Sequence, residues 1–508
     1  MRSQGVGDNL ASEMGLGSIK DRSLKQARWS ALLLLALASC TVGPDFAPPK
    51  APSVKQYTSE TDPTATTSAG GVAQQFEPGA KVAAEWWRLF NSRDLDAIIK
   101  EAVANNPTLQ AAQATLRQSQ YSLRAGYGVF YPAIGGDFDA TRQRFSSLKF
   151  GQKASPNIFS LFTLSATISY ALDVFGGERR AVEALGAEVD LRRASERATY
   201  LTLISNIVNA VIAKAAYHAE IKATGQLIEL QREQVKLAED QAQAGTAPYS
   251  TVLSFQSQLA SNEAEIPQLE QKMSQTEHLL ATLVGHMPAE WKAPDLVFAD
   301  LALPSELPLS LPSDLVRQRP DILAAEATLH NANANIGVAT AALFPSFSLN
   351  AGYGTNNTDL NNLFGASGNF WSLGANVATP IFQGGTLWYN RKAAVENFQQ
   401  SLATYRGTVL SAFAQVADTL RALEHDAMAL EAQGRARDTA DQALRLITAN
   451  YEAGLATYTD VLVANVQYHQ ATIGELESLA VRYQDTVALF VALGGGWWNS
   501  ERNNAEAP

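Results

Sequence analysis

The 508-residue chain has a single cysteine, Cys40, and this scarcity limits the chemistry that it can carry. One thiol cannot form an intrachain disulfide bond, and it excludes a metal site built from cysteines. The six histidines include no HExxH motif and no close pair, so we expect no metal centre. No GxSxG motif, phosphate-binding loop or convergent cluster of His, Asp and Glu appears. We therefore expect no enzymatic activity and no bound cofactor.

Positive charge is also sparse. The formal net charge is −11, and no block of lysine and arginine occurs beyond the first thirty residues. A nucleic-acid partner is therefore not expected. A hydrophobic fraction of 46% with 18% charged residues indicates a chain that folds and buries apolar surface.

The position of Cys40 follows from the N-terminal sequence. A basic region precedes a short apolar stretch, Trp29 to Ala38, which is too short to span a bilayer as a stable helix. The order Leu-Ala-Ser-Cys ending at Cys40 resembles a bacterial lipobox, which implies removal of residues 1–39 and lipid attachment to Cys40. The alternative is a plain signal peptide with an incidental cysteine.

Two or three acyl chains, each worth about 0.8 kcal/mol per buried methylene, would hold the protein on a membrane without a spanning helix. Thr41 follows the cysteine where an aspartate commonly signals retention in the inner membrane, so the outer membrane is favoured. Residues 40–80 are rich in Pro, Ser, Thr and Gly and predict an extended tether.

The rest of the chain is an internal repeat with an offset near 210 residues. Residues 105–132 align with 318–345, and the Gly-Gly pairs and later helix-ending glycines of the two halves also align. The predicted division is a first repeat 81–285, a connector 286–312 with five prolines, a second repeat 313–494 and a tail 495–508.

Each repeat contains a helix, two strands and two long helices. Phe347, Leu349, Ala351 and Tyr353 alternate with polar residues, which predicts a strand with one apolar face. The predicted β-hairpins span about 134–175 and 346–382. The strand near 134–145 is ambiguous, because Arg142 and Arg144 share parity with Phe138.

The predicted long helix hairpins span 177–285 and 384–493. No proline interrupts the pattern from Gly177 to Ala244, and roughly 65 residues at 1.5 Å each would reach about 100 Å. The returning helix, about 249–284, has a heptad repeat of apolar residues typical of a coiled-coil seam, and Pro267 can kink it.

Alternating strands beside a lipid anchor indicate a membrane β-barrel, but four strands are too few to close one. Two copies would supply eight strands, which side chains fill, whereas three copies would supply twelve and leave an aqueous lumen. The polar face of the strands carries small residues that suit the wall of a water-filled lumen, so we expect a trimer. The alternative for the strands is an ordinary soluble sandwich.

Four motifs carry a family resemblance over essentially the whole mature chain: CTVGPDFAPP, WWRLFNSRDLDAIIKEAVANNPTLQAA, the FGG and FQGG turns, and YEAGLATYTDVLVAN. The chain resembles a TolC-type outer-membrane efflux factor of the NodT or OprM-like lipoprotein branch. The resemblance implies a mainly α fold with membrane β-structure. The homotrimer would form a twelve-stranded barrel, continued by a long periplasmic α-helical barrel with a small mixed equatorial region.

The resemblance also implies that the channel conducts substrates passively from an inner-membrane pump and its periplasmic adaptor, while lipid anchors it in the outer membrane. The predicted sites are the strand-to-helix turns at Gly176, Gly177, Gly384 and Gly385, and the adaptor-contact tips at Gly245, Ala247, Tyr249, Gly454, Leu455, Ala456 and Thr457. The alternative for the tips is plain turn packing.

Asp460 is the gate candidate, because family members often carry a carboxylate facing the closed tunnel mouth at this place. A second acidic residue is common three positions on, but this chain has Val463, so a gate here would depend more on dewetting than on charge. The alternative is a solvated helix carboxylate. The first-half equivalent of Asp460 is Thr251.

The competing function is a lipid-anchored periplasmic coiled-coil adaptor or scaffold without a pore. Such a protein would carry one coiled-coil hairpin with flanking β-domains, whereas this chain carries two tandem halves, each with an amphipathic strand pair.

Overall fold

The computed structural model describes residues 41–146, 151 and 155–499, and the signal segment with Cys40 lies outside them. The chain divides into two compact units. Within the described residues, unit 1 contains 41–47, 120–188 and 329–401, and unit 2 contains 48–119, 189–328 and 402–499. Each unit takes parts of both sequence repeats, so the units do not coincide with the repeats.

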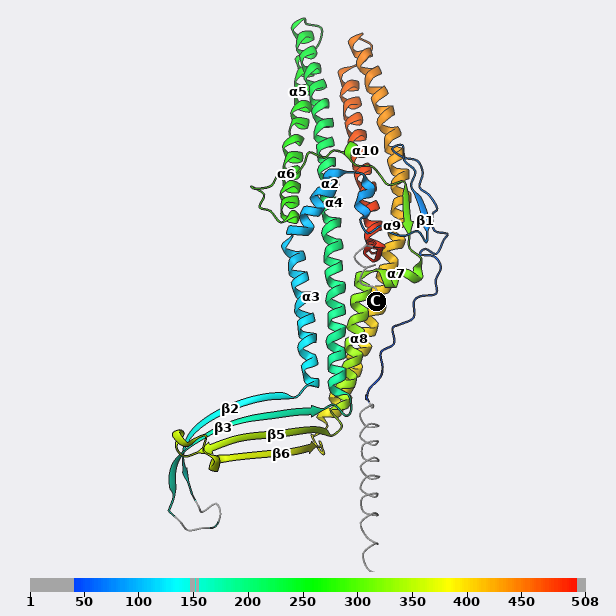
Figure 1. Ribbon diagram of the computed structural model, residues 1–508. Coiled ribbons are helices and arrows are strands. Elements are labelled where there is room, and N and C mark those ends of the chain that lie inside the picture. Colours follow the sequence, from blue (N-terminus) through cyan, green and yellow to red (C-terminus); the bar gives the residue numbers. More distant parts are fainter. Residues whose placement is uncertain (1–40, 147–150, 152–154, 500–508) are drawn as a thin grey trace, which may run out of the picture. The chain divides into compact units, whose positions relative to one another are not determined.

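Unit 1 contains a four-stranded antiparallel sheet in the order β2-β3-β5-β6 (Figure 1). The strands are β2 (Ala133–Phe145), β3 (Asn157–Leu172), β5 (Ser346–Asn357) and β6 (Asn369–Ala378). The ambiguous strand near 134–145 is therefore formed. The last strand ends at Ala378 and not at Phe382, because Pro380 has no backbone N–H to continue a ladder.

The register gives this sheet one apolar and one polar face. Ile168 pairs with Ile134 and Ala351, and Ala351 pairs with Leu373 on one face. On the other face, Ser165 pairs with Asp137 and Gly354. The apolar side chains are nevertheless exposed, with Ile134 and Trp371 both 77% accessible. β2 and β6 are the edge strands, so the isolated protomer leaves both an apolar face and two backbone edges uncovered.

Four helices contribute to both units: α3 (Pro107–Gly126), α4 (Gly177–Gln243), α8 (Pro320–Ala341) and α9 (Thr386–Glu452). α4 and α9 have 67 residues each, as the uninterrupted pattern of the sequence predicts. The Asp173 carboxylate accepts hydrogen bonds from the backbone N–H groups of Glu178 (3.0 Å) and Arg179 (2.9 Å), which satisfies donors in the first turn of α4.

The hairpins are completed in unit 2 by α5 (Tyr249–Glu263), α6 (Glu265–Val284) and α10 (Tyr458–Ala492). The helix expected over about 249–284 is thus two helices with a break at Ala264. Pro267 lies in the first turn of α6, where its missing N–H costs no helical hydrogen bond.

The mixed region of unit 2 contains η1 (Trp86–Phe90), α2 (Arg93–Asn105), α7 (Pro312–Gln318) and a parallel pair of short strands, β1 (Gln75–Pro78) and β4 (Glu306–Leu309). The remaining 3-10 turns are η2 (Tyr127–Phe130), η4 (Phe298–Asp300), η5 (Leu360–Asn362), η6 (Ala366–Gly368) and η7 (Trp497–Asn499). Trp86 and Trp87 lie in the main apolar core. Trp86 stacks on Phe490 of α10 with ring centroids 5.2 Å apart.

Residues 65–78 differ from the extended tether that the sequence predicts, because Arg482 holds them. The Arg482 side chain is fully buried, and its guanidinium donates hydrogen bonds to the Ala69 carbonyl (2.7 Å), the Val72 carbonyl (3.0 Å) and Gln74 Oε1 (3.1 Å). A buried guanidinium must fill its donors, and the carbonyls of this loop supply the acceptors.

Within the described residues, one helix, α4, contains an 18-residue window apolar enough to cross a membrane, with mean hydropathy 1.2, and 56% of that window is buried. Buried residues of α4 such as Ile204, Ile207 and Ile212 belong to the core of unit 2. This part of α4 therefore packs in the core of unit 2.

Candidate functional site

The strand-to-helix turns of unit 1 carry the glycines that the sequence singles out. Gly176, Gly384 and Gly385 have φ of +77°, +58° and +85°, a backbone region that costs side-chain-bearing residues energy. Gly177 has an ordinary φ, and its role is close packing. A Cβ there would lie 3.0 Å from the Cβ of Ala341 on α8.

A socket in unit 1 holds residues 41–47, which directly follow Cys40. We call it the anchor socket, and it is formed by Phe175, Gly176, Arg180, Glu183, His330, Asn333 and Gly337. The backbone N–H of Val42 donates to the Phe175 carbonyl at 3.0 Å, and Asn333 Nδ2 donates to the Pro44 carbonyl at 2.9 Å.

Charge and close backbone packing complete the anchor socket. Arg180, with a side chain only 5% exposed, forms ion pairs with Asp45 at 2.6 Å and with Glu183 at 2.7 Å. Phe46 stacks on His330 with centroids 4.3 Å apart, and His330 Nε2 lies 3.0 Å from Glu183 Oε1.

Two glycines let the backbones meet in the socket. A Cβ on Gly43 would lie 2.5 Å from the Cα of Gly337, and a Cβ on Gly176 would lie 2.8 Å from the Cα of Thr41. The segment after the candidate lipidation site is thus fixed by backbone, ion-pair and ring contacts. Sequence analysis missed this socket.

The two helix-hairpin turns of unit 2 end in the same way. Gly245 and Gly454 have φ of +74° and +77°. In each turn the next residue donates its N–H back to the last helical turn, from Thr246 to the Gln241 carbonyl (3.0 Å) and from Leu455 to the Asn450 carbonyl (2.7 Å). This is a Schellman motif, so the glycines themselves end the helices.

Around these turns, the candidate contact residues differ in exposure. Tyr249 and Leu455 are 65% and 80% exposed, whereas Ala247 and Ala456 are half-buried. Beneath them, an apolar cluster, here called the tip cluster, joins the two hairpins through Ala238, Val252, Phe255 and Val461. The Tyr451 hydroxyl donates to Gln241 Oε1 at 2.7 Å and ties α9 to α4.

Asp460 and Thr457 form a capping box at the start of α10. The Asp460 carboxylate accepts from the Thr457 backbone N–H (2.8 Å) and from the Thr457 hydroxyl (2.7 Å), and these hydrogen bonds lower the pKa of Asp460. Val463 is 51% exposed, whereas Thr251 is buried. Sequence analysis missed the cap, although a threonine three residues before an acid is its signature.

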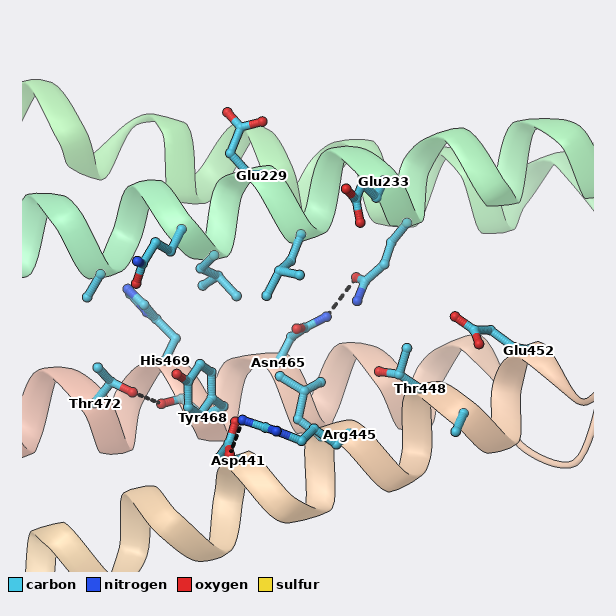
Figure 2. Close-up of a pocket in the computed structure, with 17 residues that line it drawn as sticks. Glu229, Glu233, Asp441, Arg445, Thr448, Glu452, Asn465, Tyr468, His469 and Thr472 are labelled. Carbon is cyan, nitrogen blue, oxygen red and sulfur yellow. Dashed lines mark hydrogen bonds and ion pairs between the residues drawn. The ribbon is translucent and has the colours of Figure 1, made fainter.

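A gap of about 780 Å³, lined by both polar and apolar side chains, separates α4 from α9 and α10 below the tip cluster (Figure 2). Asn465 donates to Gln234 Oε1 at 2.7 Å across it, and Asp441 pairs with Arg445 at 2.9 Å on its α9 side. His469 Nε2 lies 3.2 Å from the Thr224 hydroxyl, and burial lowers the pKa of His469. The two hairpins therefore meet here through a mixture of polar contacts and buried leucines such as Leu227 and Leu444.

No group of three or more His, Cys, Asp and Glu side chains in the described ranges is placed to hold a metal ion. The candidate site residues instead form helix-ending turns, a helix cap and packing surfaces.

Residues 98–286 and 311–495 match a family model described as outer membrane efflux protein. The chain is 30% identical over 428 residues to the pyoverdine export outer membrane protein OpmQ of Pseudomonas aeruginosa, which covers 83% of this chain and 89% of that protein. It is also 30% identical over 473 residues to nodulation protein T of Rhizobium leguminosarum bv. viciae, with 92% and 93% covered. A solved structure of the outer-membrane channel OprN matches with a TM-score of 0.82 at 25% identity, covering 90% of this chain and 100% of that one.

Proposed function

The chain belongs to the outer membrane efflux protein family, and from this membership we propose how its copies assemble, how they are anchored and what they contact. The predicted family, fold class and outer-membrane location are confirmed, and the protein is the outer-membrane exit duct of a tripartite efflux system. The family consists of channels and not enzymes. A pore-less adaptor or scaffold is therefore excluded.

Three copies close one channel. The observation that supports this proposal is the open sheet of unit 1, whose edges β2 and β6 have free backbone groups and whose apolar face is exposed. Hydrocarbon does not tolerate such edges, so each β6 must pair with the β2 of a neighbouring copy. Eight strands would be filled by side chains, whereas twelve leave a lumen.

The test combines the mass of the detergent-solubilised protein with its conductance in a planar bilayer. We expect three chains per particle and discrete channels. A monomer or dimer, or a trimer that conducts no ions, would contradict the proposal.

Cys40 carries the covalent lipid that holds each chain on the outer membrane. The anchor socket supports this, because it fixes Thr41 against Gly176, one residue from the acylated position. Mass spectrometry of the N-terminal peptide of the membrane-extracted protein tests it. A mature protein that begins at an unmodified Cys40, or upstream of it, would contradict lipidation.

The partners are a periplasmic adaptor and an inner-membrane pump, and the adaptor contacts the tip residues. The exposed Tyr249 and Leu455, above the tip cluster, support this assignment. Since Cys40 is the only native cysteine, Leu455→Cys introduces a unique free thiol once Cys40 is lipidated. We expect crosslinking of Leu455→Cys to the adaptor in cells, and no crosslinking of a control Leu446→Cys, which is 64% exposed on α9.

The gate lies near Asp460 and Val463, where both side chains are exposed in the single chain. Cargo choice belongs to the pump, because a passive duct selects little. The relatives' names fit this view, since one is named for pyoverdine export and another for nodulation.

A further inference from the structure

Two arginines lie on the apolar face of the sheet. Arg142 pairs with Ser160 and Arg144 with Ile158, which places both on the face that carries Ile134 and Phe138. Both arginine side chains are exposed. Charged residues on a lipid-facing barrel surface are unfavourable at the centre of the bilayer, so their presence requires a reason.

On that face, no acid of the described strands balances the two arginines. The sheet's aspartates, Asp137 and Asp139, have the opposite parity and lie on the polar face. Within the described strands, the apolar face carries no Asp or Glu, and among the described residues no ion pair to Arg142 or Arg144 is formed. In the described β5–β6 loop, Asp359 accepts from the Asn361 backbone N–H at 3.0 Å and caps η5.

The two arginines lie at the strand end farthest from the helices of unit 1. β2 follows η2 directly and begins at Ala133, and Arg142 and Arg144 come 142 − 133 = 9 and 144 − 133 = 11 residues later. At about 3.3 Å per residue and a tilt of about 40°, they stand about 23 Å and about 28 Å above Ala133 along the membrane normal. The apolar band of an outer-membrane barrel is about 25 Å tall, so a β2 strand that enters the band at Ala133 carries both arginines to its outer boundary.

The chemistry at this boundary points to a phosphorylated lipid. A guanidinium binds phosphate in a bidentate manner, and side chains two apart on a strand lie about 7 Å from each other. Directly below them on the same face lie Ala140 and Phe138, which suit acyl chains. A small inorganic anion would use the arginines but not this apolar surface.

The second hairpin lacks such a pair. At its corresponding end, the apolar face carries Thr355, Asn357 and Asn369. The site is therefore a feature of the first repeat and occurs once per chain.

Resting on the proposed trimeric barrel, we infer that Arg142 and Arg144 bind the phosphate groups of a phosphorylated glycolipid of the outer leaflet, whose acyl chains cover the adjoining apolar face of β2. Each trimer then carries three such sites. Each site binds a headgroup beside β2, the edge strand at which neighbouring copies meet.

The test uses the purified full-length protein in detergent and measures retained lipid by native mass spectrometry. The probes are lipopolysaccharide with its lipid A phosphates, the same lipid after enzymatic dephosphorylation, and inorganic phosphate. The variant is Arg142→Gln with Arg144→Gln. The charge-matched control is Arg391→Gln with Lys392→Gln, which removes two positive charges from the start of α9, outside the sheet.

We expect the wild type and the control to bind the phosphorylated lipid at least about tenfold more tightly than the Arg142/Arg144 double variant. For dephosphorylated lipid, the three proteins should not differ. Equal binding of the phosphorylated lipid by all three proteins would overturn the inference. Complete displacement of the lipid by millimolar inorganic phosphate would show a small-anion site and overturn the lipid assignment.

Should the glutamine variant fail to assemble, Arg142→Lys with Arg144→Lys keeps the charge and loses the bidentate geometry, and it should bind about three- to tenfold more weakly. Unchanged binding by a lysine variant that assembles would likewise count against the inference. Trimer mass and conductance are measured on the same wild-type sample. If the wild-type protein is not a conducting trimer, the proposed function itself is contradicted, whether or not the protein binds the lipid.

Discussion

The two strand-to-helix turns occupy equivalent places in the two repeats, yet only the first is covered. At Gly176, Thr41 of the N-terminal segment fills the space a side chain would need, whereas a Cβ on Gly384 would meet nothing within 4 Å. Beside the second turn, Ile381 and Phe382 are 94% and 89% exposed. Duplication thus supplied the same turn twice, and the single N-terminal segment made the two turns unequal.

The helix hairpins of the two repeats differ in a second way, in the charges between their paired helices. In the first, Lys214 of α4 forms an ion pair with Glu277 of α6 at 3.1 Å. In the second, Asp426 of α9 faces Asp485 of α10, and burial together with that neighbour raises the pKa of Asp426 to about 7. Opposite charges join both hairpins, since Arg437 of α9 also pairs with Glu475 of α10 at 3.1 Å, but the second hairpin adds a carboxyl group that favours its proton.

The largest expected effect tests the two turns directly through Gly176→Ala and Gly384→Ala. Both substitutions place a side chain at positive φ, which costs about 1–2 kcal/mol. Gly176→Ala also overpacks against Thr41, adding about 1–3 kcal/mol. We expect a clearly lower unfolding temperature for Gly176→Ala than for Gly384→Ala, measured by the heat-induced loss of the trimer in detergent. Equal losses would mean that the N-terminal segment does not cover the first turn in the assembled protein.

The anchor socket gives the next largest effect, through Arg180→Met. This change removes the ion pairs to Asp45 and Glu183, and hydrogen bonds to charged groups are worth about 1.5–3 kcal/mol. We expect faster hydrogen exchange in the peptide that contains residues 41–47, including the Val42 amide that bonds to Phe175. The control Arg391→Met, near the start of the second long helix, should leave this peptide unchanged. Unaltered protection of this peptide from hydrogen exchange in Arg180→Met would mean that Arg180 does not hold the N-terminal segment in the socket.

The charges between the paired helices predict different effects of substitution on stability. The folded-state pKa of Asp426 is raised, so its contribution to stability is complete below the unfolded pKa, near 4, and is lost as the pH rises to about 7. Asp426→Asn should therefore flatten the fall of the unfolding temperature between pH 4 and pH 7. Glu277→Gln should lower the unfolding temperature at neutral pH, because Lys214, buried and only 5% exposed, loses its shorter ion pair and keeps the longer one to Asp295 at 3.5 Å. Parallel curves for wild type and Asp426→Asn would exclude a titrating pair there.

Helices and strands with a regular pattern of apolar residues are predictable from the sequence. The alternation of β5 and the proline-free run of α4 follow from single residues at fixed spacing, and Gly245 and Gly454 end helices for a reason visible in the residue type itself. The family likeness then adds the assembly, which periodicity alone cannot supply.

Contacts between distant segments are less predictable. Residues 65–78 have the composition of a linker, but they pack because the buried Arg482 of α10 needs acceptors. The single arginine of α10 was the feature of the sequence that could have indicated this packing. The anchor socket had none, because Gly43 and Gly337 reveal their role only once the backbones are brought together.

The smallest expected effect comes from the tips of the two helix hairpins, because only the second tip has a capping box. The first hairpin has Pro248 before α5 without a side-chain cap, whereas Thr457 and Asp460 cap α10. Thr457→Ala should cost about 1 kcal/mol through the lost cap and leave the charge unchanged. Asp460→Ala breaks the same box and also removes three carboxylates from the trimer. If these carboxylates form a ring at the closed mouth, Asp460→Ala alone raises the resting single-channel conductance in a planar bilayer. Equal increases in both variants would assign the effect to the cap, and an unchanged conductance in Asp460→Ala would remove the residue from the gate.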